Sequence, residues 1–318
     1  MAVEITEEFV WQSIPPRARD SHKGTFGSVL AVAGSAFYRG AALLAAEGAL
    51  RTGAGIVTLA SVEPVVSAAV TRLPECCLCP CKEGAQGGIA PENVPLLRRQ
   101  KATVLLLGPG LGGTAQSAAR ATETRTLVQQ LLPGFVGAAV LDADGLNATA
   151  QLLAEGKPFP HPAGELVVTP HPGEMARLTG LSAAALATDR EGIALRYAKA
   201  WNAVVVLKGA RTVVASPDGR VCVNPTGNPG QAPGRQRGCT GWDACGAAGL
   251  RSARLPSCCL CGISARCRRR PRRRKARRVR DAAPRYPAGT GRIVCGKPKI
   301  NEKRQLHKTP CSCRFLLL

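Results

Sequence analysis

Short apolar runs alternate with stretches of helical periodicity along the first 230 residues. Apolar runs bounded by glycine or polar turns predict strands that are buried on both faces of a parallel sheet. Two longer stretches, 40–52 and 183–201, predict helices because their apolar positions recur at helical spacing. This alternation is typical of a layered, doubly wound α/β sheet. The expected buried strands are 28–34, 56–60, 103–107, 139–141, 165–168 and 203–207.

The stretch 213–223 predicts a β-hairpin. Apolar residues 213–215 and 221–223 flank SPDGR, whose Asp-Gly pair is suited to a tight turn. Elsewhere, each loop that is rich in Gly, Pro, Asp or His follows the C-terminal end of an expected strand. Open α/β sheets bind ligands at that edge, so we expect the functional site there.

Charge divides the chain near residue 230. Residues 1–230 hold 20 Lys+Arg against 18 Asp+Glu, whereas residues 231–318 hold 23 against 3 and nine of the 14 cysteines. The net charge of +22 therefore arises almost wholly from the last part. Blocks of like charge such as RRRPRRRKARRVR are usually solvated and disordered. The sequence predicts a folded domain over 1–230 and a disordered basic tail over 231–318, which binds no specific nucleic acid.

Membrane, secretory and metal-scaffold functions are disfavoured. No run approaches the roughly 18 apolar residues that cross a bilayer, and the acidic N-terminus lacks the basic region of a signal peptide. We therefore expect a cytoplasmic protein without a membrane partner. The cysteines of LPECCLCPC would alternate between the faces of a strand, and no second pair or histidine completes a zinc site. We expect buried free thiols there.

The loop GPGLGG, residues 108–113, is the first candidate for ligand binding. It formally matches G-x-G-x-x-G after a strand. Two strand–helix units precede it, however, and no acidic residue follows at the distance that a dinucleotide fold requires. A glycine-rich turn also exposes backbone N–H groups to an anion. Ligand contact and a purely structural turn both remain open.

Two further strand ends carry ionisable side chains. In TPHPGE, two prolines hold His171 at the expected ligand edge, where it contacts a ligand or serves as a structural residue. In LDADGLN, Asp142 and Asp144 are suited to Mg²⁺ through water or to a substrate hydroxyl. Alternatively, one of the two aspartates caps the following helix.

Two later loops have the composition of anion-binding loops. The first brings together a cation, a glycine and a hydroxyl, a combination that suits phosphate oxygens. The second is NPTGNPG, residues 224–230, which contains Asn228 and Gly230. The first loop consists of Lys208, Gly209, Ala210, Arg211 and Thr212.

Six motifs in one order resemble those of the NAD(P)H-hydrate dehydratases, members of the ribokinase-like superfamily. The resemblance covers about residues 8–230. It implies a three-layer α/β fold with a central, mostly parallel sheet. It also implies repair of hydrated NADH or NADPH, in which ADP or ATP phosphorylates the C6 hydroxyl and loss of phosphate restores the reduced ring. The motifs are HKGTFGSVLAVAGSAFYRGAALLAAEGALRTGAG, GPGLG, LDADGLN, TPHPGE, VVLKGART and NPTGNPG.

The resemblance also implies roles for individual residues. Ala41, Gly110 or Gly112, and His171 would contact the NAD(P)H hydrate. Lys208 to Thr212 would hold the phosphates of ADP or ATP, together with the loop that contains Asn228 and Gly230. Mg²⁺ is the expected cofactor, because phosphoryl transfer needs charge stabilisation. The family tends to form tetramers, so a homo-oligomer is expected.

After Gly230 the chain departs from the family pattern. The family places its general base, an aspartate, in a loop resembling GNPGMATGG-S/T-GDVLAG, and Gly238 stands at that position here. The codons of RQRGCTGWD, read one nucleotide later, can spell Gly-Ser-Gly-Asp-Val-Leu-Ala-Gly-Met. The sequence therefore predicts a reading-frame shift, with the fold incomplete at its C-terminal part and the chain inactive as written. A divergent natural tail is the alternative.

Two other functions stay open at this point. The chain could be another ribokinase-like kinase that acts on a small molecule, although TPHPGE together with NPTGNPG argues against this. It could also be a non-catalytic protein that binds polyanions through its basic tail.

Overall fold

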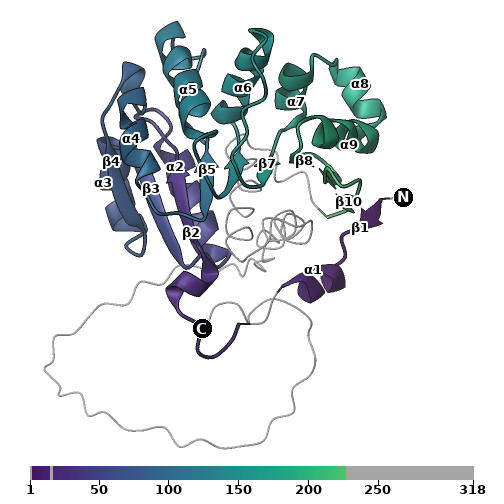
Figure 1. Ribbon diagram of the computed structural model, residues 1–318, viewed down its shortest axis with the longest axis horizontal. Coiled ribbons are helices and arrows are strands. Elements are labelled where there is room, and N and C mark those ends of the chain that lie inside the picture. The colour runs from purple at the N-terminus through teal and green to yellow at the C-terminus, as the bar shows by residue number, and fades with distance from the viewer. Residues whose placement is uncertain (1, 15–16, 227–318) are drawn as a thin grey trace, which may run out of the picture. The chain divides into compact units, whose positions relative to one another are not determined.

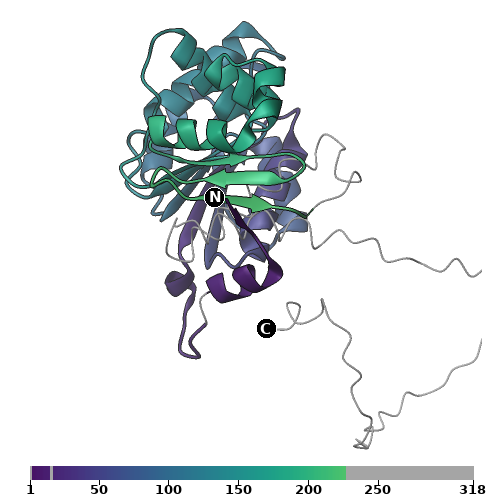
Figure 2. The same ribbon diagram turned by 90° about the vertical axis from the view of Figure 1, so that its right-hand side faces the viewer.

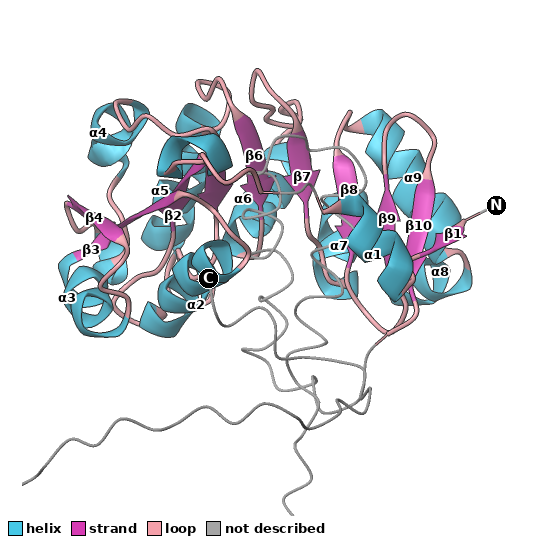
Figure 3. Ribbon diagram, turned by 90° about the horizontal axis from the view of Figure 1, so that it is seen from below, coloured by secondary structure: helices cyan, strands magenta, loops and turns pink. Residues whose placement is uncertain are grey.

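The computed structural model describes residues 2–14 and 17–226, and within them ten strands form one sheet. The order across the sheet is β1-β10-β9-β8-β7-β6-β5-β2-β3-β4, which Figure 3 shows from end to end. The strands are β1 (Val3–Glu4), β2 (Ser28–Val32), β3 (Ile56–Val62), β4 (Cys77–Cys81), β5 (Val104–Leu107), β6 (Ala138–Leu141), β7 (Leu166–Val168), β8 (Val204–Leu207), β9 (Thr212–Ala215) and β10 (Val221–Asn224).

Most of the sheet is parallel. Every pair from β4 through β3, β2, β5, β6 and β7 to β8 is parallel, whereas β8–β9 and β9–β10 are antiparallel. The N-terminal strand β1 pairs in parallel with β10. Figure 2 shows this end of the sheet, where the purple N-terminal segment meets the green late strands. The hairpin predicted around SPDGR is confirmed as β9–β10.

Helices connect most of the successive parallel strands. The helices are α1 (Glu7–Ser13), α2 (Arg39–Arg51), α3 (Glu63–Arg72), α4 (Val94–Arg98), α5 (Ala118–Leu131), α6 (Asp144–Ala154), α7 (Pro172–Thr179), α8 (Ala183–Thr188) and α9 (Arg190–Ala200). Three short 3₁₀ turns add to them: η1 (Lys23–Phe26), η2 (Ala85–Gly87) and η3 (Pro91–Asn93).

The direction of winding reverses between β2 and β5. From β2 the chain runs outward through β3 to β4, then returns to β5 and runs the other way to β8. Right-handed crossovers in opposite directions place their helices on opposite faces of a sheet. Accordingly α2 and α3 contact each other, while α5, α6 and α7 lie side by side in a separate row (Figure 1). Such a reversal opens a ligand crevice at the strand ends.

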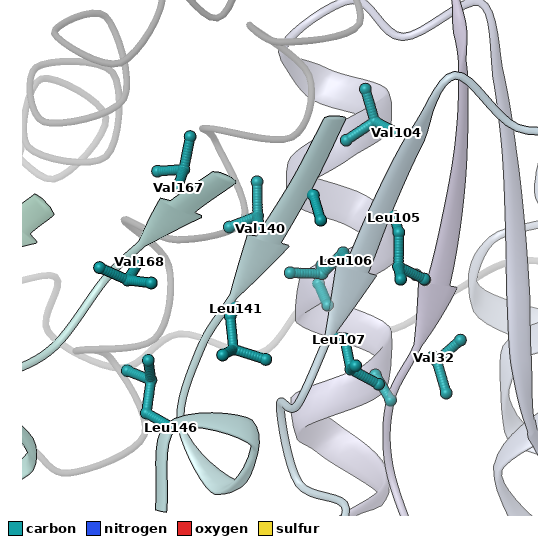
Figure 4. Packing of buried hydrophobic residues seen from close by; sticks show 14 of the residues in the cluster. Val32, Val104, Leu105, Leu106, Leu107, Val140, Leu141, Leu146, Val167 and Val168 are labelled. Carbon is teal, nitrogen blue, oxygen red and sulfur yellow. The ribbon is translucent and has the colours of Figure 1, made fainter. Parts of the chain in front are cut away.

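The central strands are apolar because both of their faces are covered. Each residue of β5 is at most 1% exposed, and β6 and β7 contribute further valines and leucines to the same cluster (Figure 4). In register, Leu106 lies opposite Ala31 on one side and Val140 on the other. This core fixes the strand ends from which the loops of the candidate site begin.

The expected strands and the helix at 40–52 are confirmed to within two residues. The single helix expected over 183–201 is wrong, because α8 ends at Thr188 and α9 begins at Arg190. Asp189 between them has φ −139° and ψ 76°, and its carboxylate accepts a hydrogen bond from the Gly192 N–H. An aspartate that caps a new helix therefore interrupts a pattern that is continuous in the sequence.

The cysteine-rich segment forms the edge strand β4 and its approach. Cys76, Cys79 and Cys81 are buried free thiols, as expected, whereas Cys77 is exposed. No helix of the described residues is long and apolar enough to cross a membrane. The expected tail at 231–318 lies outside the described residues.

Candidate functional site

A buried ion pair links the carboxyl ends of β6 and β8. Lys208 Nζ lies 2.8 Å from Asp142 Oδ1, and these residues are 7% and 0% exposed. Thr169, at the end of the intervening strand β7, donates its hydroxyl to the same Asp142 oxygen at 2.7 Å. The other oxygen, Oδ2, is buried and has no hydrogen-bond partner among the described residues. Three neighbouring strand ends thus converge on one carboxylate that keeps an unused oxygen.

Glu174 adds a second buried carboxylate to this cluster. Its Oε2 accepts the backbone N–H of His171 at 2.7 Å and lies 3.9 Å from Lys208 Nζ. Burial raises the pKa of Glu174 from 4.5 to about 7, because desolvation outweighs the attraction of Lys208. Glu174 was missed as a site residue. The available signal was its place at the third position of a helix that starts with Pro172, four residues after the last residue of β7.

His171 caps helix α7 with its side chain. Nδ1 accepts hydrogen bonds from the N–H groups of Gly173 at 3.0 Å and of Glu174 at 3.3 Å. Because Nδ1 is an acceptor, the proton of the neutral ring lies on Nε2, which is 3.3 Å from Glu174 Oε1. The structural role considered for His171 is therefore present, and it orients the ring at the edge of the carboxylate cluster. Contact with a ligand remains a prediction.

The glycine loop after β5 packs against the start of α2. Gly110 has φ +68°, and a Cβ there would lie 2.8 Å from the Ala41 Cβ and 2.9 Å from the Tyr38 Cβ. Gln116 connects the two segments, since its amide donates to the Tyr38 hydroxyl at 2.7 Å and accepts from Gly113 N at 2.6 Å. The structure therefore brings Gly110 together with Ala41, which the sequence placed in the same predicted site.

The two aspartates of LDADGLN do not converge on one point. Asp142 is directed towards Lys208, whereas Asp144 Oδ2 accepts the Gly112 N–H at 2.9 Å. Burial raises the pKa of Asp144, and the Gly112 hydrogen bond opposes that effect. Neither aspartate caps α6, because Ala143 is the N-cap and makes no side-chain hydrogen bond. The capping alternative is therefore wrong. The described residues contain no group of three or more His, Cys, Asp or Glu side chains arranged to hold a metal ion.

A buried arginine on α5 supports the glycine loop, and it was not predicted from the sequence. The Arg120 side chain is fully buried on α5, with Nη1 3.0 Å from Glu123 Oε2 and Nη2 donating to Ile89 O at 3.0 Å. Its Nε donates to the hydroxyl of Thr124, which donates in turn to Gly112 O at 2.8 Å. An arginine in a helical pattern is ordinarily read as an exposed residue, so composition could not reveal this role.

The loop Lys208–Thr212 follows β8 in a strained conformation. Gly209 and Arg211 have φ +153° and +55°, and a positive φ at a non-glycine residue is uncommon. Lys208 N donates to Pro170 O at 2.8 Å, which joins this loop to TPHPGE. The second predicted anion-binding loop is not fully described, because Asn228 and Gly230 lie outside the described residues. The same holds for Gly238, at the position of the family aspartate.

Comparison of the sequence identifies the family. The sequence model of the NAD(P)H-hydrate dehydratases matches residues 29–237, and so ends one residue before Gly238. The bifunctional NAD(P)H-hydrate repair enzyme Nnr of Moorella thermoacetica is 44% identical over 230 residues, which are 72% of this chain and 42% of that protein. The ADP-dependent (S)-NAD(P)H-hydrate dehydratase of Bacillus subtilis is 35% identical over 72% of this chain and 75% of its own length. The chain thus spans about two fifths of the bifunctional relative.

Comparison with solved structures supports the same family. The ADP/ATP-dependent NAD(P)H-hydrate dehydratase of B. subtilis, co-crystallised with ATP/Mg²⁺, has a TM-score of 0.68 at 29% identity over 83% of this chain and 87% of that one. A ribokinase-like superfamily protein of Enterococcus faecalis shares the fold, with a TM-score of 0.70 at 22% identity over 83% of this chain and 86% of its own. The chain therefore belongs to the NAD(P)H-hydrate dehydratase family, and its α/β fold is ribokinase-like.

Proposed function

We propose that residues 1–230 form the ligand-binding part of an ADP- or ATP-dependent (S)-NAD(P)H-hydrate dehydratase. The lineage reaction transfers a phosphoryl group to the C6 hydroxyl of hydrated NADH or NADPH, and phosphate then leaves to restore the reduced ring. The observation that carries the proposal is the buried Lys208–Asp142 pair beside Glu174, at the strand ends where such a fold binds ligands. A lysine held there is suited to the charge of a transferred phosphoryl group.

The hydrate would lie along the glycine loop. Gly110 leaves no room for a side chain because Ala41 and Tyr38 pack against it, and this close packing would hold the loop and the start of α2 together as one wall of the site. Asp144 would hold this wall in place through the Gly112 N–H. His171, whose ring is oriented by the cap of α7, would face the hydrate from the end of β7. The residues proposed to contact the hydrate are Ala41, Gly110, Gly112 and His171.

The nucleotide phosphates would lie on the loop after β8, with Mg²⁺ beside it. Lys208 supplies a positive charge, and Gly209, Ala210, Arg211 and Thr212 supply the backbone. The uncommitted, buried Oδ2 of Asp142 fits a hard cation, which prefers carboxylate oxygens and water. Asp144 fits less well, because its Oδ2 accepts the Gly112 N–H. When bound, Mg²⁺ would neutralise charge on the phosphates. Asn228 and Gly230 belong to this proposal through the resemblance alone.

The chain as written is proposed to bind its ligands without turning them over. The family aspartate that takes the proton of the hydroxyl is replaced by Gly238, and the matching codons in the adjacent frame can encode that aspartate. Loss of a general base alone lowers the rate by a factor on the order of 10²–10⁴. The frame shift accounts for this loss and for the basic composition after Gly230. The proposal also includes that the chain forms a homo-oligomer, a tetramer if it follows the family that it resembles.

Calorimetric titration of the purified full chain tests the binding part of the proposal. We expect ATP with Mg²⁺ to bind the wild-type chain and Lys208→Met to weaken that binding. Lys199→Met is the matched control, because Lys199 is exposed on α9. If the wild-type chain bound neither ATP nor ADP, or if Lys208→Met bound as tightly as the control, the assignment of the nucleotide loop would be wrong.

A further inference from the structure

The guanidinium of Arg190 is bound to the loop that follows β8. Nη1 donates to Ala210 O at 2.8 Å, and Nη2 donates to Leu207 O at 3.1 Å and to Lys208 O at 3.3 Å. A single side chain from another element thus sets the direction of three carbonyls, one at the end of β8 and two in the loop that follows it. The Nε of Arg190 is buried and has no hydrogen-bond partner among the described residues.

The position of Arg190 in its helix is unfavourable by local rules. It is the first residue of α9, where the helix dipole disfavours a positive charge. Asp189 already caps the helix through the Gly192 N–H, so α9 does not need Arg190 for its start. A residue that breaks a local rule while making three specific contacts elsewhere is expected at a functional position.

The contacts determine which way the loop presents its N–H groups. A trans peptide places its C=O and the following N–H on opposite sides. Because the carbonyls of Lys208 and Ala210 are directed towards Arg190, the N–H groups of Gly209 and Arg211 are directed to the opposite side of the loop. Backbone N–H groups gathered on one side of a loop form an anion-binding surface.

Gly209 is adapted to the same arrangement. Its φ of +153° disfavours a side chain, and a Cβ would lie 2.8 Å from both Nη atoms of Arg190. The contacts of Arg190 therefore require the glycine, because the guanidinium can bind the loop in this position only where no Cβ intervenes. Arg211, with φ +55°, is held in its strained conformation next to the carbonyl that Nη1 binds.

We propose that Arg190 is a positioning residue for the nucleotide loop: by binding the carbonyls of Leu207, Lys208 and Ala210 it directs the opposite N–H groups towards the phosphates of ADP or ATP. The inference rests on the proposed function for what binds there. The arrangement of the loop itself does not depend on that function. Arg190 lies on the far side of the loop from the proposed ligand and acts through the backbone.

The test uses the full chain with Arg190→Ala, Arg190→Lys and the control Arg196→Ala, since Arg196 is exposed on the same helix. Amide hydrogen exchange without ligand is followed for residues 207–212. We expect Arg190→Ala to accelerate exchange in this segment by about tenfold or more, while β5 and β6 and the control stay as in the wild type. Arg190→Lys keeps the positive charge but lacks the planar guanidinium that binds several carbonyls at once, so an intermediate rate of exchange is expected. Equal exchange in Arg190→Ala and wild type would overturn the inference.

Titration separates this inference from the proposed function. With ATP and Mg²⁺ we expect Arg190→Ala to bind about tenfold or more weakly, whereas NADPH hydrate, bound at the glycine loop, keeps its affinity. Guanidinium chloride at a low, non-denaturing concentration should restore part of the ATP affinity. An equal loss for both ligands would indicate a general structural role and contradict the inference. If the wild type bound no nucleotide, the proposed function of the loop would fall, and the exchange measurement would still decide the role of Arg190.

Discussion

Lys208 Nζ lies 2.8 Å from Asp142 Oδ1, and this contact joins the ends of β8 and β6 across the intervening strand β7. Both groups are buried, and Thr169 from β7 completes the connection. The pair therefore serves two purposes in our account. It holds three strand ends together, and it keeps a lysine at the edge where the phosphoryl group is proposed to bind.

Removing one partner of this pair should destabilise the fold. In Lys208→Met the Asp142 carboxylate stays buried without its cation, which typically costs about 3–5 kcal/mol. Urea unfolding of the variant measures the change in free energy. The double variant Lys208→Met/Asp142→Leu should recover much of it, since no uncompensated charge remains. A loss no larger than that of the exposed control Lys199→Met would contradict the structural role of the pair.

The glycine loop offers a matched pair of substitutions. Gly110→Ala should weaken binding of the NADPH hydrate and lower stability by about 1–3 kcal/mol, because a Cβ there meets Ala41 and Tyr38 at φ +68°. Gly113→Ala should be close to neutral in both respects, because nothing lies within 4 Å of its added Cβ. Thermal unfolding and hydrate titration compare the two. Similar losses of stability and of hydrate binding at both positions would contradict the specific role proposed for Gly110.

Arg120 should behave as a structural support of the same loop. Arg120→Met leaves Glu123 and the carbonyl of Ile89 without their guanidinium partner inside the protein. We expect a loss of about 3–5 kcal/mol in urea unfolding. Arg125→Met, which breaks a partly exposed pair with Glu155, should cost less than about 1 kcal/mol. Comparable losses in the two variants would argue against the support role of Arg120.

The burial of the cysteines predicts which thiols react with an alkylating agent and how the free energy of unfolding depends on pH. Burial raises the pKa of Cys76 from 9.0 to about 11 and that of Cys81 to about 12, whereas Cys77 is exposed. Peptide mapping after alkylation at neutral pH should therefore find Cys77 modified and Cys76 and Cys81 protected. Early modification of the two buried thiols would contradict their burial.

The same shifts predict how stability varies in alkali. The folded state holds the Cys76 proton more tightly than the unfolded chain does, so this contribution is complete below pH 9.0. It should be lost as the pH rises through about 11. Cys76→Ala should flatten that part of the curve of unfolding free energy against pH. An unchanged curve would mean that Cys76 does not contribute.

The sequence predicted the parts of the fold that depend on apolar pattern. Runs such as VLLL at 104–107 are buried on both faces, and their ends located the loops of the site. The functional charges were harder to foresee. Glu174, Arg120 and Arg190 are buried or half-buried through contacts with distant segments, and their side chains look like ordinary surface positions in the sequence.

One helix prediction was wrong, and two neighbouring carboxylates have different partners for a comparable reason. The residues 183–201 keep a helical period, yet the conformation of Asp189 divides them into α8 and α9. Asp142 and Asp144 are close in the chain but belong to different environments, because the first completes a strand end and the second begins a helix. Spacing alone could not tell which partner each carboxylate would meet.

The most direct test of the central claim is the recovery of NADH from its hydrate with ADP or ATP and Mg²⁺. The assay compares the full chain with the product of a gene from which one nucleotide is deleted at the codon of Arg235. We predict no detectable recovery by the chain as written and nucleotide-dependent recovery by the frame-restored protein. Substantial turnover by the chain as written, or none by the frame-restored protein, would contradict the account.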